Sequence, residues 1–183
     1  MKRFLPLLVL LTLLSSCAAN ITNSDGLGFV ASDGSAVVLD IENRQEATDL
    51  TARLLDESGS WRLRANQGTV LFLNTWGPWC APCRKEIPEL QKIFEELGSG
   101  FEVVGFATRT TKSQAEAFLA NKDITYTQVQ DFSSSVIARL DGIPSSTIPS
   151  TIFIDKENRI AGWALGAADP TLLKTIAKSL LEE

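Results

Sequence analysis

Residues 69–88 read TVLFLNTWGPWCAPCRKEIP, and the order of apolar and polar residues in this stretch decides the fold. The stretch begins with an apolar run that is typical of a strand buried on both faces. A helix is expected from Pro82 onward, because apolar residues then recur at three- and four-residue spacing as far as Gly98. The two cysteines, Cys80 and Cys83, therefore lie where a buried strand passes into a helix.

This position has chemical consequences for both cysteines. Cys80 is expected at the helix N-terminus, where unpaired backbone N–H groups and the helix dipole favour an anion. These groups lower the pKa of a thiol below its free value of about 8.5, and the thiolate is the nucleophilic form. Cys83, one turn later, can form a disulfide with Cys80 and is expected to point into the protein. The arrangement predicts thiol–disulfide exchange.

Two structural explanations for the cysteine pair are weaker. A disulfide that closes so short a loop stabilises a chain by only about 2 kcal/mol on the chain-entropy formula, and a structural disulfide more naturally joins distant segments. A metal site needs further ligands, and the chain has three cysteines and no histidine. The lack of histidine also excludes Ser/His/Asp and Cys/His catalysis and covalent haem attachment. We therefore expect neither a metal nor a cofactor.

The rest of the chain predicts an α/β domain with a central sheet and helices on both of its faces. Two short hairpins are expected before the first buried strand. Further strands and helices alternate after it, and we see no linker that would divide the domain. The expected hairpins cover 29–39 and 51–63, the further strands 101–107, 126–129, 151–155 and 159–165, and the helices 113–121, 133–140 and 169–183.

The N-terminus has the pattern of a bacterial signal peptide. Lys2 and Arg3 precede an apolar run over 4–14, which is too short to span a membrane. Small residues come just before Cys17, as in a lipoprotein box, where the cysteine thiol receives a diacylglycerol and becomes the first mature residue. The hydrocarbon then holds the protein at a membrane, outside the cytoplasm. Ordinary secretion with Cys17 as a free thiol is the alternative.

These features divide the chain into three expected parts. Residues 1–16 are the lipoprotein signal peptide, residues 17–27 the lipidated cysteine with a flexible tether, and residues 28–183 the folded domain. The chain has 17 Lys and Arg against 22 Asp and Glu, a formal charge of -5. An acidic chain without a basic run argues against nucleic acid and against a polybasic membrane patch. A single acidic domain favours a monomer.

The segment Thr75–Cys83 resembles the active-site segment of the thioredoxin superfamily, and its extension to Pro88 resembles the membrane-tethered TlpA/ResA-type thiol–disulfide oxidoreductases. The resemblance covers about residues 50–183. It implies a thioredoxin fold, an α/β fold with a central mixed sheet flanked by helices, and an N-terminal β-hairpin extension. It also implies that Pro149 is a cis-proline beside the two sulfurs, which leaves backbone groups of Ile148 free to pair with an extended substrate. A trans proline that starts an edge strand is the alternative.

The resemblance assigns further roles near the cysteines. In the TlpA/ResA-type family, an acid at the position of Glu86 tunes cysteine ionisation, and a partly buried carboxylate there could also move protons. A solvated helix glutamate is the alternative. Asn74 stands where thioredoxins proper carry a buried acid, which shifts any proton role to Glu86 or water. Trp76 is expected in the core. Trp79 is expected to be exposed and to contact a protein partner, with simple packing as the alternative.

The predicted function is that of an extracytoplasmic protein-disulfide reductase. Cys80 attacks a substrate disulfide, and Cys83 then resolves the mixed disulfide. The family resemblance implies a membrane thiol carrier as electron donor and often a task in cytochrome c maturation. A disulfide-forming oxidase is the first alternative. A Cu(I) carrier and a peroxiredoxin-type peroxidase are weaker, because related copper chaperones use wider cysteine spacing with a histidine, and the peroxidase needs a threonine where Gly77 stands.

Overall fold

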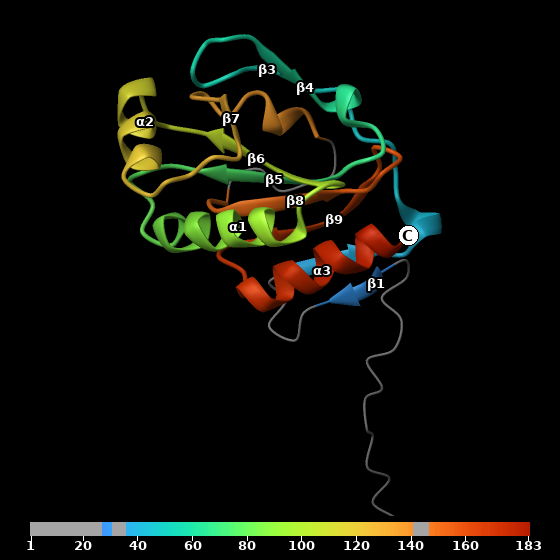
Figure 1. Ribbon diagram of the computed structural model, residues 1–183. Helices are drawn as coiled ribbons and strands as arrows, with labels where there is room; N and C mark the ends of the chain where they lie inside the picture. Colours follow the sequence, from blue (N-terminus) through green and yellow to red (C-terminus); the bar gives the residue numbers. More distant parts are fainter. Residues whose placement is uncertain (1–26, 31–35, 141–146) are drawn as a thin grey trace, which may run out of the picture.

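The structure is a computed structural model that describes residues 27–30, 36–140 and 147–183 (Figure 1). The expected signal peptide, the lipidation site Cys17 and the tether as far as residue 26 lie outside these residues. In the described part of the chain, no helix combines the length and the apolar character that a membrane crossing requires.

Seven of the nine described strands form one sheet in the order β1-β2-β9-β8-β5-β6-β7, and β3 and β4 form a separate pair. The central strand β5 pairs in parallel with β6 and antiparallel with β8, which confirms the predicted mixed sheet. The hairpin β1–β2 extends the sheet beyond β9, as the predicted N-terminal extension requires. The bounds are β1 (Leu27–Val30), β2 (Ala36–Leu39), β5 (Val70–Trp76), β6 (Phe101–Ala107), β7 (Thr127–Gln130), β8 (Ser150–Ile154) and β9 (Ile160–Leu165).

The α-helices cover only one face of this sheet, so the expectation of helices on both faces is wrong. Figure 1 shows α1 and α3 side by side, and the buried apolar residues of all three described α-helices belong to one core cluster with Phe72 and Trp76 of β5. The other face is covered by the small hairpin β3–β4 and the 3₁₀ turn η3, which pack with Leu71 and Leu73. The bounds are α1 (Cys83–Leu97), α2 (Lys112–Ala120), α3 (Pro170–Glu182), β3 (Thr51–Arg53), β4 (Ser60–Arg62) and η3 (Ile137–Arg139).

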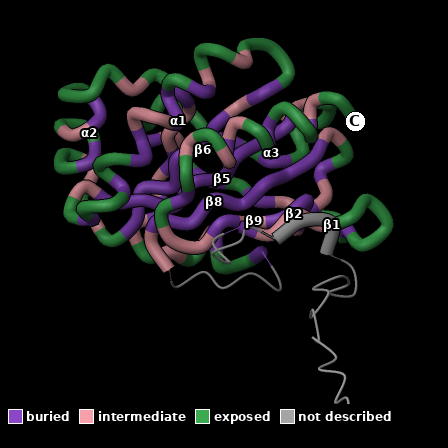
Figure 2. The backbone as a smooth tube through the Cα atoms, turned by 90° about the horizontal axis from the view of Figure 1, so that it is seen from below, coloured by how far each residue is buried: buried purple, intermediate pink, exposed green. Residues whose placement is uncertain are grey.

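Burial on both faces explains why the decisive stretch has so continuous an apolar run. Every residue of β5 and of β8 is buried, and the purple backbone in Figure 2 is concentrated in this part of the sheet. Because neither face of β5 meets water, alternation of apolar and polar residues would leave polar side chains in the core. The apolar run therefore predicted the central strand correctly.

The expected helix over 133–140 is wrong. Only the short turn η3 forms there, and Ser134 has a positive φ of 59°. The Asp131 carboxylate accepts hydrogen bonds from the backbone N–H groups of Val136 and Ile137, each at 3.0 Å. These bonds satisfy N–H groups through a side chain, which lets the chain turn without building a regular helix. The second face of the sheet is therefore covered without a long helix.

The strand directions determine which residues lie at each end of the sheet. The end at which β5 leads into α1 also holds the start of β8, because Thr75 pairs with Ser150. Since β8, β9, β2 and β1 are successively antiparallel, β2 ends at the opposite end of the sheet. Leu27, the first residue of β1, pairs there with Leu39. The chain therefore enters the sheet at the end farther from the cysteines.

Candidate active site

The two cysteines lie at the junction of β5 and α1, as predicted. They form a disulfide with an S–S distance of 2.04 Å and a Cα–Cα distance of 5.3 Å. The Cys80 carbonyl accepts a hydrogen bond from Arg84 N at 3.1 Å, so the turn that holds Cys80 continues into the helix. The Cys83 N–H points at Cys80 Sγ, at an N–Sγ distance of 3.2 Å. A helix N–H directed at this sulfur stabilises negative charge on it once the pair is reduced.

The two cysteines are not equally enclosed. Cys83 has no exposed surface, whereas 5% of Cys80 is exposed. An incoming disulfide therefore meets Cys80, which agrees with the prediction that Cys83 points into the protein.

Pro149 lies beside the cysteines, and the Ile148–Pro149 peptide bond is cis. The Ile148 carbonyl oxygen is 3.8 Å from Cys80 Sγ. Ile148 is half-buried, and its carbonyl oxygen faces the sulfur. The structure thus brings the Cys80–Cys83 pair next to Ile148 and Pro149, although the two pairs lie more than 60 residues apart in sequence.

Glu86 is buried rather than solvated. Only 4% of the residue is exposed, and it follows Cys83 by three positions on the same side of α1. Asn74 Nδ2 donates to one carboxylate oxygen at 2.9 Å and Ala168 N to the other at 3.2 Å. Burial raises the pKa of Glu86 from 4.5 to about 7, and the two hydrogen bonds only partly oppose this effect. This carboxyl can therefore exchange a proton near neutral pH.

Asn74 is a residue whose contacts the sequence did not reveal. Its amide donates to Glu86 and also to Thr151 Oγ1 at 3.0 Å, so it joins β5, α1 and β8 behind the cysteines. The signal in the sequence was an asparagine inside an otherwise apolar run. The structure buries this amide fully, and a buried amide needs hydrogen-bond partners. The sequence could not say which partners these would be.

A hollow of about 590 Å³ opens beside the cysteine turn and is lined in part by Pro82, Lys85, Glu86 and Ala168. Glu86 is one of the residues that line it. The hollow lies between the start of α1 and the segment that leads into α3.

Trp79 is the exposed aromatic residue of the site, as predicted, with 53% of its surface accessible. Its indole N–H donates to the Arg109 carbonyl oxygen at 2.9 Å, which fixes the ring direction. A Cβ on Gly77 would lie 2.6 Å from Trp79 Nε1, so only glycine leaves room for the indole. Trp76, in contrast, is wholly buried in the core. Among the described residues, no group of three or more His, Cys, Asp or Glu is placed to hold a metal ion.

Comparison with known proteins agrees with this geometry. Residues 44–162 match the model of the AhpC/TSA family, which is more than half of the chain. The chain belongs to the AhpC/TSA family. Several relatives of this AhpC/TSA protein are named thiol-disulfide oxidoreductase ResA. The protein from Bacillus subtilis is 26% identical over 75% of this chain and 77% of its own length. The protein from Geobacillus thermodenitrificans is 30% identical over 69% of each chain.

Solved structures resemble this AhpC/TSA protein over most of its length. A secreted thiol-disulfide isomerase from Corynebacterium glutamicum has a TM-score of 0.77 and 32% identity, covering 86% of this chain and 100% of that one. A DsbF homologue from Corynebacterium diphtheriae has a TM-score of 0.74 and 32% identity, covering 83% and 98%. The predicted thioredoxin-like fold and ResA-like resemblance are confirmed. This AhpC/TSA protein is a thiol–disulfide oxidoreductase with the redox pair Cys80–Cys83.

Proposed function

We propose that the protein reduces protein disulfides outside the cytoplasm. The observation that carries this proposal is the unequal enclosure of the pair: 5% of Cys80 is exposed and its sulfur lies beside the Ile148 carbonyl, whereas Cys83 is fully buried. The names of the ResA relatives support the chemistry, and the site supplies a route for each step.

The reaction begins with both cysteines reduced. The Cys80 thiolate attacks one sulfur of a substrate disulfide, forms a mixed disulfide and releases the other substrate sulfur as a thiolate. Cys83 then loses its proton and attacks Cys80 Sγ. The second substrate sulfur leaves as a thiolate, both substrate thiolates take up protons, and the Cys80–Cys83 disulfide forms. Two electrons pass from the protein to the substrate.

We assign the proton step to Glu86, acting as a base toward Cys83. Its pKa of about 7 lets it accept a proton at neutral pH and return it to solvent through the adjoining hollow. Asn74 would position the carboxyl through its 2.9 Å hydrogen bond. Trp79, with Ile148 and Pro149, would form the surface against which the substrate backbone lies.

We also propose how the protein is anchored and how its disulfide is reduced again after each turnover. Residues 1–16 would be removed, and Cys17 would carry a lipid that anchors a monomeric domain to a bacterial membrane. A membrane thiol carrier would reduce the Cys80–Cys83 disulfide after each turnover, and apocytochrome c is the first substrate to test. The basic start, the short apolar run and the small residues before Cys17 support the anchor.

Reduction potential tests the direction of the reaction. We expect equilibration with glutathione or dithiothreitol, followed by tryptophan fluorescence, to give a potential below about −220 mV, in the range of disulfide reductants. A value near about −120 mV is that of a strong oxidant and would replace the reductase with the disulfide-forming oxidase. The Cys80→Ser variant is the control, because it has no disulfide and should show no transition.

A further inference from the structure

The segment around Pro149 is held by a side-chain hydroxyl. Ser150, the first residue of β8, donates from its Oγ to the Thr147 carbonyl oxygen at 2.6 Å. This bond closes a turn around Ile148 and Pro149. Only 2% of Ser150 is exposed, so the bond is shielded from water and is stronger than it would be at the surface. The two ends of the turn are therefore tied to one another.

A second hydroxyl, that of Thr75 near the end of β5, holds the backbone of Ser150. Thr75 Oγ1 accepts a hydrogen bond from Ser150 N at 3.1 Å and donates to the Ser150 carbonyl oxygen at 3.3 Å. Thr75 is 3% exposed, so these bonds are shielded as well. Because β5 leads into the cysteine turn, one side chain connects the strand before Cys80 to the segment that carries Pro149.

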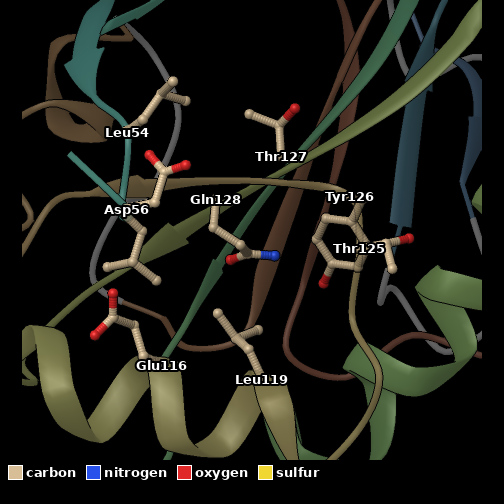
Figure 3. Close-up of a pocket in the computed structure, with 9 residues that line it drawn as sticks. Leu54, Asp56, Glu116, Leu119, Thr125, Tyr126, Thr127 and Gln128 are labelled. Atoms are coloured by element: carbon tan, nitrogen blue, oxygen red, sulfur yellow. The ribbon is translucent and has the colours of Figure 1, made fainter. Parts of the chain in front are cut away.

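Thr75 itself lies on a firmly held part of the sheet. The next residue, Trp76, donates from Nε1 to Gln128 Oε1 at 2.9 Å, and its carbonyl oxygen accepts from Thr108 N at 2.8 Å. Gln128 belongs to β7 and also lines a hollow beside α2, where Figure 3 shows its amide. Bonds to two neighbouring segments thus fix the end of β5, and a group on so rigid an element can position another segment accurately.

Ile148 is the residue whose backbone these bonds leave free. The carbonyl groups on either side of it accept hydrogen bonds from within the protein, namely those of Thr147, Pro149 and Ser150. Among the described residues, no N–H or O–H group donates to the Ile148 carbonyl oxygen, and the Ile148 N–H has no acceptor. The carbonyl oxygen faces Cys80 Sγ, which carries no hydrogen in the disulfide.

We propose that the hydroxyls of Thr75 and Ser150 position Ile148 for thiol–disulfide exchange. They keep the Ile148 carbonyl and N–H beside Cys80 Sγ, where an extended substrate pairs with them while its disulfide meets the sulfur. Thr75 and Ser150 are positioning residues, because they act through Ile148 and not on the reacting sulfurs. The inference rests on the proposed docking of substrate along Ile148 and Pro149.

Two substrates separate positioning from a general loss of structure. One consists of two extended peptides joined by a disulfide, and the other is the aromatic disulfide dithiobis(nitrobenzoate), which has no backbone to pair. Stopped-flow mixing with the reduced full chain gives single-turnover rate constants on the high-pH plateau, where Cys80 is ionised. All proteins carry Cys17→Ser, so that only the redox pair reacts.

Thr75→Val and Ser150→Ala should each slow the reaction with the peptide disulfide about 3- to 10-fold, because a hydrogen bond to the substrate is misplaced. The reaction with the aromatic disulfide should change by less than about 2-fold, since it uses no such bond. Equal slowing of both reactions would overturn the proposal, because the substitutions would then disturb the cysteines themselves. Unchanged peptide rates in both variants would also overturn it.

Two further variants complete the test. Thr75→Ser keeps the hydroxyl and should restore the wild-type peptide rate. Thr175→Val removes from α3 a hydroxyl that also donates to a carbonyl, that of Thr171 at 2.8 Å, and should alter neither rate. A peptide rate as slow in Thr75→Ser as in Thr75→Val would contradict the role of the hydroxyl. A wild-type potential of a strong oxidant would overturn the proposed direction alone, since these ratios compare variants in a single reaction.

Discussion

In the proposed reaction the two cysteines have different roles, because only Cys80 keeps any exposed surface. Cys80 is 5% exposed and Cys83 is fully enclosed. We expect Cys83→Ser to accumulate mixed disulfides between Cys80 and substrate, because the resolving thiol is missing. Cys80→Ser should abolish turnover without forming adducts. Non-reducing electrophoresis followed by mass spectrometry measures both results, and normal turnover by Cys83→Ser would refute the assigned roles.

Glu86 should make the stability of the oxidised protein depend on pH. Its pKa is about 7 when folded against 4.5 as the ordinary value. Below the lower value the carboxyl is protonated in both states, and above the higher value it is ionised in both. Between them the unfolded chain releases its proton first, so the folded state loses stability as pH rises, by about 3 kcal/mol in total.

The Glu86→Gln variant should lack this part of the pH dependence. Urea unfolding of the oxidised protein at about pH 4 and pH 8 measures the difference, and the disulfide keeps cysteine titration out of the comparison. Glu89→Gln, which alters a half-exposed glutamate on the same helix, should keep the wild-type pH dependence. An identical loss of stability in Glu86→Gln would show that another group is responsible.

At the scale of elements, Gly162 allows β2 to join the sheet. Gly162 has a φ of 153°, and a Cβ on it would lie 2.1 Å from the Val37 carbonyl oxygen of β2. We expect Gly162→Ala to lower the free energy of unfolding by at least about 2 kcal/mol. The new Cβ would clash with backbone atoms, which cannot move away as the end of a flexible side chain can. Urea unfolding measures this loss, and limited proteolysis should show earlier cleavage near the hairpin β1–β2.

Gly59→Ala is the matched control for this substitution. Its nearest neighbour to a new Cβ is a side-chain atom of Leu54 at 3.9 Å, which is ordinary contact. The control should change the unfolding free energy by less than about 0.5 kcal/mol. If Gly162→Ala is as harmless as the control, β2 is not held against β9 as described.

The sequence predicted elements best where burial alone determines the pattern. Strand β6 has the predicted bounds, Phe101–Ala107, and the cysteines lie at the predicted junction of a buried strand and a helix. The helix over 133–140 failed because the Asp131 side chain competes for backbone N–H groups, and periodicity does not detect such bonds. The Asn74–Glu86 contact could not be predicted either, since it depends on how closely β5 and α1 pack.

At the scale of the whole molecule, Arg44 joins three distant parts of the chain. Its side chain is 2% exposed and contacts Asp155 of the β8–β9 turn at 3.2 Å. It also donates to Glu183 at 2.9 Å and to the Leu39 carbonyl at 3.1 Å. Removing one partner of such a buried ion pair costs about 3–5 kcal/mol.

Arg44→Met should therefore lower the free energy of unfolding by about 3 kcal/mol while leaving the reduction potential unchanged. The reduction potential should not change, because Asp155, the partner of Arg44, follows β8 at the end of the sheet away from Cys80. Urea unfolding and redox titration test the two halves of this prediction. Arg64→Met is the control, since Arg64 is half exposed and should contribute about 1 kcal/mol or less. A shifted potential in Arg44→Met would mean that the two ends of the sheet are coupled.

The antiparallel course of β8, β9, β2 and β1 has a consequence for orientation in the cell. Leu27 enters the sheet at the end opposite the one where β5 leads to Cys80. A domain attached to a lipid bilayer through Cys17 would then hold its reactive sulfur on the side away from the bilayer, facing diffusing substrates. A donor embedded in the bilayer could reach that sulfur only after the domain turns over on its tether, residues 17–27. We therefore expect that a shortened tether slows re-reduction of the Cys80–Cys83 disulfide more than it slows the reduction of soluble substrates.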